Sequence, residues 1–229
     1  MNDQRSKTLE TVTVETGPNP SFAIIWMHGL GADGHDFEPL VPELLDDGMP
    51  ALRFVFPHAP VRPVTINNGY QMRAWYDITG IDRRSAEDLA GIQASAQAIG
   101  ELIRAENARG IACSRIALAG FSQGGAMALH VTTRYPDKLA GVVALSCYLP
   151  LARQFAVERT NANIATPIFM AHGSQDPVVP FGMGDESRRI LEATGYLVEW
   201  HAYPMPHSLC AEEVADLKIW LARRFISGR

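Results

Sequence analysis

Apolar residues occur along the chain in short blocks separated by mixed segments, and this pattern predicts alternating strands and helices. Residues 22–27 are apolar at every position, which is typical of a strand buried on both faces of a sheet. Residues 8–15 instead alternate apolar and polar positions, as a strand at a sheet edge does. Further apolar blocks of strand length lie at residues 52–56, 115–119, 141–145, 167–171 and 197–203.

Segments with the pattern of helices lie between these strands. We expect helices in the stretch that ends at Asp46, over residues 85–109, after Ser122, over residues 185–194 and over residues 211–225. Strands and helices that alternate in this way predict an α/β fold with a mostly parallel central sheet and helices on both faces. The composition shows no break, so residues 1–229 are expected to form a single domain.

Residues 57–84 fit neither pattern. The segment is rich in Pro and Asn and poorly periodic. A loop of this length inside a compact domain is usually a lid or a binding element. Because ligands bind at the carboxyl ends of parallel strands, we expect residues 57–84 to form a lid-like loop insertion beside such a site.

Composition narrows the range of partners. The chain has 229 residues, of which 47% are hydrophobic and 20% charged, and this is sufficient for a globular core. The net charge of −5 argues against a nucleic-acid surface or a polybasic membrane patch. No apolar stretch is long enough to cross a bilayer, so we expect neither a signal peptide nor a stable membrane anchor. The three widely spaced cysteines are typical of reduced thiols, which predicts a cytoplasmic protein.

The candidate chemistry centres on residues 120–124, which read Gly-Phe-Ser-Gln-Gly. This is a Gly-x-Ser-x-Gly motif between a predicted strand and a predicted helix, the context of a nucleophile elbow in an α/β-hydrolase fold. The tight turn crowds the serine backbone against the residues two before and two after it, which favours glycine at both. Ser122 is therefore the candidate nucleophile, placed at a helix N-terminus whose partial positive charge faces the reaction centre.

A second glycine-rich segment, residues 29–34, spells Gly-x-Gly-x-x-Gly after a strand and matches a dinucleotide-binding fingerprint. That fingerprint requires an acidic residue about 20 positions later to bind the ribose. No Asp or Glu lies between Gly48 and Tyr76. The alternative is an oxyanion loop, which donates a backbone N–H to a substrate carbonyl oxygen. We favour the oxyanion loop, with the amides of Leu30 and Gln123 as the two donors.

A serine nucleophile requires a base, and the base requires an orienting acid. In the α/β-hydrolase fold the acid and then the histidine follow the serine along the chain. His207 lies in the loop between the last strand and the last helix, at the same sheet edge as Ser122, whereas His201 lies within a strand. His130 and His172 are better explained as packed or hydrogen-bonding residues. His207 is therefore the candidate base.

Asp176 is the candidate acid, because it follows a strand and precedes Pro177, which restrains the loop. Asp185 and Glu186 are typical of a helix start, and Asp137 lies in a turn ahead of a strand. The three residues would perform two-step acyl transfer without a metal or cofactor. Two alternatives remain open: a non-catalytic ligand-binding protein on the same scaffold, and acyl transfer to an acceptor other than water.

Five segments of the chain also carry a family resemblance. They are residues 28–34, 75–78, 120–126, 145–150 and 172–176. Together they resemble the phospholipase/carboxylesterase family, which includes bacterial carboxylesterases and acyl-protein thioesterases. The similarity runs in order from about residue 23 to the C-terminus. It implies an α/β-hydrolase fold, the triad Ser122, Asp176 and His207, and oxyanion donors at Leu30 and Gln123.

By the same resemblance, Trp75, Tyr148 and Val178 would line an acyl channel. Pro206 departs from the family, whose members often carry Gly or Met before the histidine. Residues 67–73 are more polar than a channel for long acyl chains needs. We therefore expect a serine carboxylesterase for short to medium acyl esters, with thioesterase or lysophospholipase activity on long chains as the alternative. Relatives form dimers, so a homodimer is also open.

Overall fold

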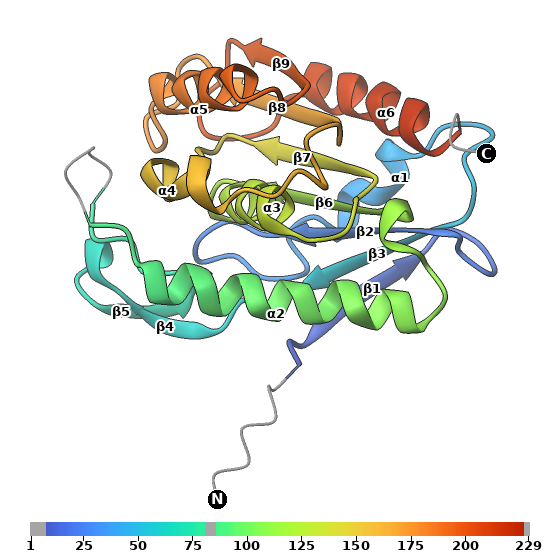
Figure 1. Cartoon of the computed structure of the whole chain (residues 1–229), viewed down its shortest axis with the longest axis horizontal. Helices are drawn as coiled ribbons and strands as arrows, with labels where there is room; N and C mark the ends of the chain where they lie inside the picture. Colours follow the sequence, from blue (N-terminus) through green and yellow to red (C-terminus); the bar gives the residue numbers. More distant parts are fainter. Residues whose placement is uncertain (1–7, 81–85, 227–229) are drawn as a thin grey trace, which may run out of the picture.

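The computed structural model describes residues 8–80 and 86–226. A seven-stranded sheet runs through the centre in the order β1-β3-β2-β6-β7-β8-β9 (Figure 1). β1 is antiparallel to β3, and each of the other neighbouring strands is parallel. The strands are β1 (Thr11–Glu15), β2 (Phe22–Met27), β3 (Leu52–Pro57), β6 (Ile116–Phe121), β7 (Gly141–Leu145), β8 (Ile168–Gly173) and β9 (Val198–Tyr203).

Helices cover both faces of this sheet, as the alternating pattern predicts (Figure 1). α2 (Leu89–Ala108), α3 (Gln123–Arg134), α4 (Ala152–Glu158) and α5 (Phe181–Ala193) lie on one face. α1 (Val41–Leu44) and α6 (Ala211–Phe225) lie on the other. Each face of the sheet has its own hydrophobic core. The successive β2 residues Ile24 and Ile25 belong to different cores, which explains why the whole strand is apolar. The predicted α/β fold with a mostly parallel sheet is confirmed.

Several boundaries differ from the sequence expectation for local reasons. The helix expected to end at Asp46 is only a 3-10 turn, Glu38–Leu40, followed by the four-residue α1. α5 begins at Phe181, directly after Pro180, and is therefore earlier than the predicted start. The first residues of the helix expected over 85–109 include Ser85, which lies outside the described residues.

The predicted loop at residues 57–84 contains a regular hairpin. β4 (Val61–Val64) pairs antiparallel with β5 (Tyr70–Arg73), and a 3-10 turn over Thr65–Asn67 joins them. Asn68 and Gly69 both have positive φ, at 56° and 75°, which turns the chain back. The two strands lie beside the N-terminal half of α2, outside the main sheet (Figure 1). The described part of the insertion thus contains a hairpin, which the weak periodicity of its sequence did not reveal.

No helix in the described part of the chain combines the length and apolar character needed to cross a membrane.

Candidate active site

The carboxyl ends of β6, β7, β8 and β9 lie at the same edge of the sheet, as the hydrogen bonds just beyond the strands show. The Ser122 N–H, just after β6, donates to the Leu145 carbonyl at the end of β7 over 2.8 Å. The Ser174 N–H, just after β8, donates in the same way to the Tyr203 carbonyl at the end of β9, also over 2.8 Å. Parallel pairing therefore brings the segments that follow four strands to one edge of the sheet.

Ser122 occupies a strained turn between β6 and α3. Its backbone has φ 54° and ψ −119°, a combination that non-glycine residues rarely adopt. A Cβ on Gly120 would overlap the carbonyl group of Gly124, and a Cβ on Gly124 would overlap the carbonyl oxygen of Met27. Both glycines are therefore sterically required, as the motif predicts. Ser122 is half-buried and caps α3, so its hydroxyl group stands at the positive end of the helix.

Asp176 and His207 form a short hydrogen-bonded pair. The distance from His207 Nδ1 to Asp176 Oδ2 is 2.6 Å. Asp176 Oδ1 accepts the backbone N–H groups of Val178 and Val179 over 2.8 and 2.9 Å. A carboxylate held in this way requires a proton on Nδ1 of the imidazole, so Nε2 carries the free lone pair of a base. The Asp176 side chain is fully buried, and 13% of the His207 side chain is exposed.

The imidazole of His207 packs beside the elbow. Its ring lies 4.7 Å, centroid to centroid, from the ring of Phe121, the residue that precedes Ser122. The structure therefore brings the candidate base and acid together at the sheet edge where the candidate nucleophile lies. Asp176 and His207 are 31 positions apart in the sequence. They meet because Asp176 follows β8, His207 follows β9, and these two strands are parallel neighbours.

Three other histidines, His130, His172 and His201, have environments that differ from that of His207. His172 Nε2 donates to the carbonyl of Val179 over 2.9 Å, and it lies 3.4 Å from Asp176 Oδ2. Burial lowers the pKa of His172, which keeps its ring neutral inside the loop that carries the acid. Burial also lowers the pKa of His130 in α3 to about 3. His201 stacks on Phe169 in the sheet. None of these three rings approaches the elbow in the way that His207 does.

The glycine-rich loop after β2 packs against the elbow. A Cβ on Gly29 would lie 3.3 Å from Phe121 Cδ1 and 3.6 Å from Ser122 Cβ. Leu30 is the next residue of this loop. Gln123 is the first residue of α3, and the N–H at that position has no acceptor within its own helix. The two predicted oxyanion donors thus come from segments that touch each other.

The His28 ring holds this loop in shape. Its Nδ1 is 2.7 Å from the carbonyl oxygen of Gly29, and its Nε2 accepts the N–H of Ala59 over 3.0 Å. The ring is therefore neutral with its proton on Nδ1. Burial lowers the pKa of His28 to about 4, which maintains that state over the physiological pH range.

The three residues expected to line an acyl channel have different environments. Trp75 is completely buried, so its ring lies in the interior and not on an accessible wall. Tyr148 is half-buried, and its hydroxyl group is 2.9 Å from the hydroxyl group of Tyr76. Val178 is 49% exposed and donates its N–H to the candidate acid. Of the three, Val178 and Tyr148 have exposed surface, and Val178 is the one that contacts the candidate acid.

Sequence reasoning missed Ser95 and the contacts by which the Gln123 side chain supports the site. The side-chain amide of Gln123 accepts the Trp75 N–H over 2.8 Å and donates to the Tyr76 carbonyl over 2.7 Å. The Ser95 hydroxyl group on α2 donates to the Trp75 carbonyl. No local motif marks these contacts, because each joins positions at least 20 residues apart.

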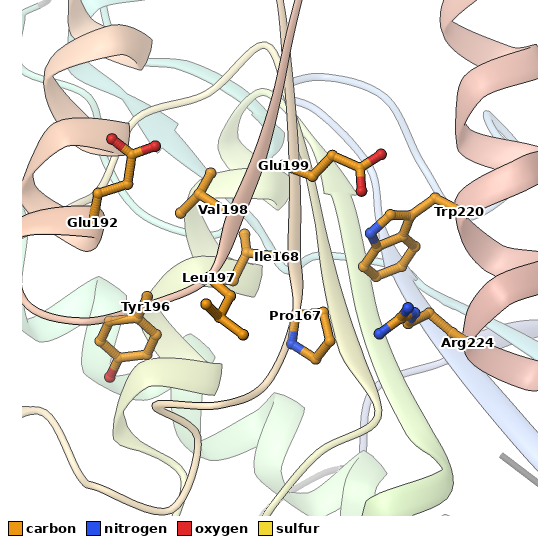
Figure 2. Close-up of a pocket in the computed structure, with 9 residues that line it drawn as sticks. All are labelled: Pro167, Ile168, Glu192, Tyr196, Leu197, Val198, Glu199, Trp220 and Arg224. Atoms are coloured by element: carbon orange, nitrogen blue, oxygen red, sulfur yellow. The ribbon is translucent and has the colours of Figure 1, made fainter. Parts of the chain in front are cut away.

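A hollow of about 370 Å³ lies at the opposite end of the sheet. Pro167 and Leu197, which precede β8 and β9, stand at its centre, with Tyr196 on one side and Trp220 and Arg224 on the other (Figure 2). These are the amino ends of the strands, away from Ser122. In residues 8–80 and 86–226, no group of three or more His, Cys, Asp or Glu side chains is arranged to bind a metal.

Comparison with known proteins identifies the family and the fold. The chain matches the phospholipase/carboxylesterase family over residues 9–224. It is 42% identical to acyl-protein thioesterase 1 of Neurospora crassa over 214 residues, which is 88% of this chain and 86% of that protein. The crystal structure of Arabidopsis thaliana SOBER1 superposes with a TM-score of 0.84 at 31% identity, covering 89% of this chain and 98% of the other.

A second solved structure, Zea mays acyl-protein thioesterase 2, also superposes with a TM-score of 0.84, at 28% identity, and covers 94% of this chain and 99% of its own. The resemblance inferred from the sequence motifs and the predicted α/β-hydrolase fold are both confirmed. This protein belongs to the phospholipase/carboxylesterase family of serine hydrolases.

Proposed function

We propose that this protein hydrolyses acyl thioesters and esters through a covalent acyl-enzyme at Ser122, with His207 as the base and Asp176 as the orienting acid. The observation that carries the proposal is the 2.6 Å bond between Asp176 and His207 beside the serine elbow. A buried carboxylate that fixes the tautomer of an imidazole next to a strained serine matches the chemistry of an activated nucleophile.

The proton movements follow from this geometry. His207 Nε2 takes the proton of the Ser122 hydroxyl group as its oxygen attacks the carbonyl carbon of the substrate. The tetrahedral intermediate collapses, and the imidazolium gives the same proton to the leaving thiol or alcohol. Water then repeats the attack on the acyl-enzyme, its proton passing to His207 and back to Ser122. Asp176 remains ionised throughout and stabilises the imidazolium.

The negative oxygen of each intermediate would be stabilised by two backbone donors, the N–H groups of Leu30 and Gln123. Removal of one such donor typically costs about 3–4 kcal/mol of transition-state stabilisation. The positive end of α3 adds to the same electrostatic field. Neither contribution requires a metal or a cofactor.

The substrate class is inferred from the relatives. Carboxylic esters of short to medium length were the main expectation from the sequence, with long-chain thioesters as the alternative. The relatives at 42% and 38% identity are both named acyl-protein thioesterase 1, from Neurospora crassa and Mycosarcoma maydis. Thioesters of acylated proteins are therefore our preferred substrates.

A carboxylesterase with a short acyl pocket is the second candidate, and the β4–β5 hairpin favours it. Met72 of β5 lies 3.7 Å from the position that a Cβ on Gly31 would occupy, so the hairpin reaches the oxyanion loop. The amide of Asn67 contacts the Met72 sulfur over 3.4 Å. A hairpin with polar residues such as Asn67 beside the oxyanion loop would suit short acyl chains better than long ones.

The nucleophile is tested with Ser122→Ala, measured by p-nitrophenyl butyrate turnover and by fluorophosphonate labelling. Both signals should fall to background. The matched control is Ser114→Ala, the same change at an exposed position at the other end of β6, which should leave both signals unchanged. Full turnover or full labelling of the Ser122→Ala protein would refute the proposal.

The substrate class is tested by comparing kcat/KM for oxygen esters and thioesters of matched acyl chains, from acetyl to palmitoyl. A maximum at long-chain thioesters is the expected result. A maximum at acetyl or butyryl oxygen esters would instead support the short-pocket carboxylesterase. Appearance of a new acyl ester with added alcohol, at the expense of free acid, would indicate acyl transfer to an acceptor other than water.

A further inference from the structure

We infer that Trp75 is a positioning residue that holds the two oxyanion donors at a fixed separation, and that it does so without touching the substrate. The inference rests on the proposed function, because it concerns the same oxyanion site. Trp75 belongs to residues 73–76, which we call the bridging segment. This segment begins with the last residue of β5, Arg73, and it is hydrogen-bonded to both donor segments.

Trp75 contacts each donor segment through a different N–H. Its indole Nε1 donates to the carbonyl oxygen of His28 over 2.9 Å, two residues before Leu30. Its backbone N–H donates to the side-chain oxygen of Gln123 over 2.8 Å. One residue therefore connects the loop that presents the Leu30 amide to the residue that presents the second amide. The indole also packs 5.4 Å from the His28 ring.

The bridging segment holds Leu30 from the other side as well. The N–H of Gly31 donates to the carbonyl of Arg73 over 2.9 Å. The peptide groups of Leu30 are thus flanked by two bonds to the same segment, one at His28 and one at Gly31. These two bonds therefore restrain the backbone on both sides of the Leu30 amide.

The bridging segment is itself anchored to the body of the protein. The Ser95 hydroxyl group on α2 donates to the Trp75 carbonyl, and the Gln123 side chain donates to the Tyr76 carbonyl over 2.7 Å. Trp75 is 0% exposed and Gln123 is 3% exposed, so water does not compete for these bonds. The site therefore meets the oxyanion with donors that are already in place, which is the condition for electrostatic stabilisation without reorganisation.

The test uses Trp75→Phe, which removes the indole donor and keeps an aromatic ring. Trp26→Phe is the matched control, because Trp26 is also buried, at 1% exposure, and its Nε1 has no hydrogen-bond partner among the described residues. We measure kcat and KM for p-nitrophenyl butyrate, corrected for active sites by fluorophosphonate titration. We also measure Ki for an alkyl trifluoromethyl ketone, whose hemiketal with the serine carries an oxyanion.

For Trp75→Phe we expect kcat to fall about 10- to 100-fold and Ki for the ketone to rise by a similar factor, with KM changed less than about threefold. Trp26→Phe should leave all three values unchanged. Equal values for Trp75→Phe and the wild type, or equal losses in both tryptophan variants, would overturn the inference. Failure of the proposed function would be distinct, because Ser122→Ala would then retain turnover.

Gln123→Met provides a second variant if Trp75→Phe fails to fold. It keeps the backbone donor and removes both side-chain bonds to the bridging segment. It should show the same selective loss of kcat. When both variants fold, the double variant should lose less than the product of the single losses, because the two residues act through one unit. Unchanged kcat in Gln123→Met, or independent losses in the double variant, would contradict the role assigned to Trp75.

Discussion

Replacement of Asp176 by Asn tests how the acid acts on the base. The two side chains have the same shape, so the loop that carries residue 176 can be retained. Oδ1 accepts two backbone N–H groups, from Val178 and Val179, and Oδ2 accepts from His207. An asparagine side chain has only one oxygen, so this oxygen can take the position of Oδ1 or that of Oδ2 but not both, and the NH₂ group takes the other position.

The hydrogen bonds that each orientation would lose determine which of the two the amide adopts. Turning the amide NH₂ toward the two backbone N–H groups would lose two buried hydrogen bonds, at about 1–3 kcal/mol each. Keeping the oxygen there places the NH₂ against Nδ1 of His207, which then has to accept a hydrogen bond. Its proton moves to Nε2, a tautomer change that costs less than the two lost bonds. Nε2 can then no longer take the proton of Ser122.

We therefore expect kcat of Asp176→Asn to fall by about 10⁴, as in serine proteases with the same change, which corresponds to about 5 kcal/mol of transition-state stabilisation. The assay is p-nitrophenyl butyrate turnover, with folding checked by circular dichroism. Asp185→Asn is the control, because Asp185 pairs with arginines on the outer side of α5 and should leave kcat unchanged. A loss smaller than about tenfold in Asp176→Asn would refute the tautomer argument.

Two further predictions concern the framework around the site. Gly124→Ala should destabilise the protein by about 1–3 kcal/mol in urea unfolding and lower kcat, because the new methyl group meets the backbone oxygens of Met27 and His28. Gly182→Ala, where nothing lies within 4 Å of the new methyl group, should be neutral or slightly stabilising, and equal effects of the two changes would contradict the steric reason. Burial raises the pKa of Glu213 from 4.5 to about 8, so the unfolded chain releases this proton at lower pH than the folded protein does. This contribution to stability is complete below pH 4.5 and is lost as the pH rises to about 8. Glu213→Gln should therefore reduce the decrease in melting temperature between these two pH values. An unchanged decrease in the variant would exclude Glu213 as the cause of the pH dependence.

The sequence was sufficient for the features that local chemistry dictates. The elbow could be predicted because its turn excludes side chains at Gly120 and Gly124 and because a strand and a helix flank it. The pairing of Asp176 with His207 followed from chain order and from parallel strands ending at one edge. In both cases a small number of residues carries a strong geometric requirement. Their catalytic roles remain predictions until the variants are measured.

Other features depend on contacts between distant segments, and for these the sequence was a poor guide. The motif around Trp75 was noticed, but its ring is buried and bonds His28, and its backbone N–H bonds Gln123, residues that are 47 and 48 positions away. The hairpin in residues 57–84 was missed because its strands are four residues long and half exposed. Strands this short carry too few positions for an alternating pattern to be recognised.

The order of strands in the sheet has a consequence for how the enzyme would lose activity. Ser122 follows β6, which lies in the middle of the sheet, whereas His207 follows β9, the last strand at one edge. Edge elements open in local fluctuations at a lower free energy than the centre of a fold. Opening of β9 would withdraw the proton acceptor while the nucleophile and its oxyanion donors stay folded. We therefore expect the working lifetime of the proposed catalyst to depend on how firmly β9 pairs with β8, although the nucleophile itself follows the central strand.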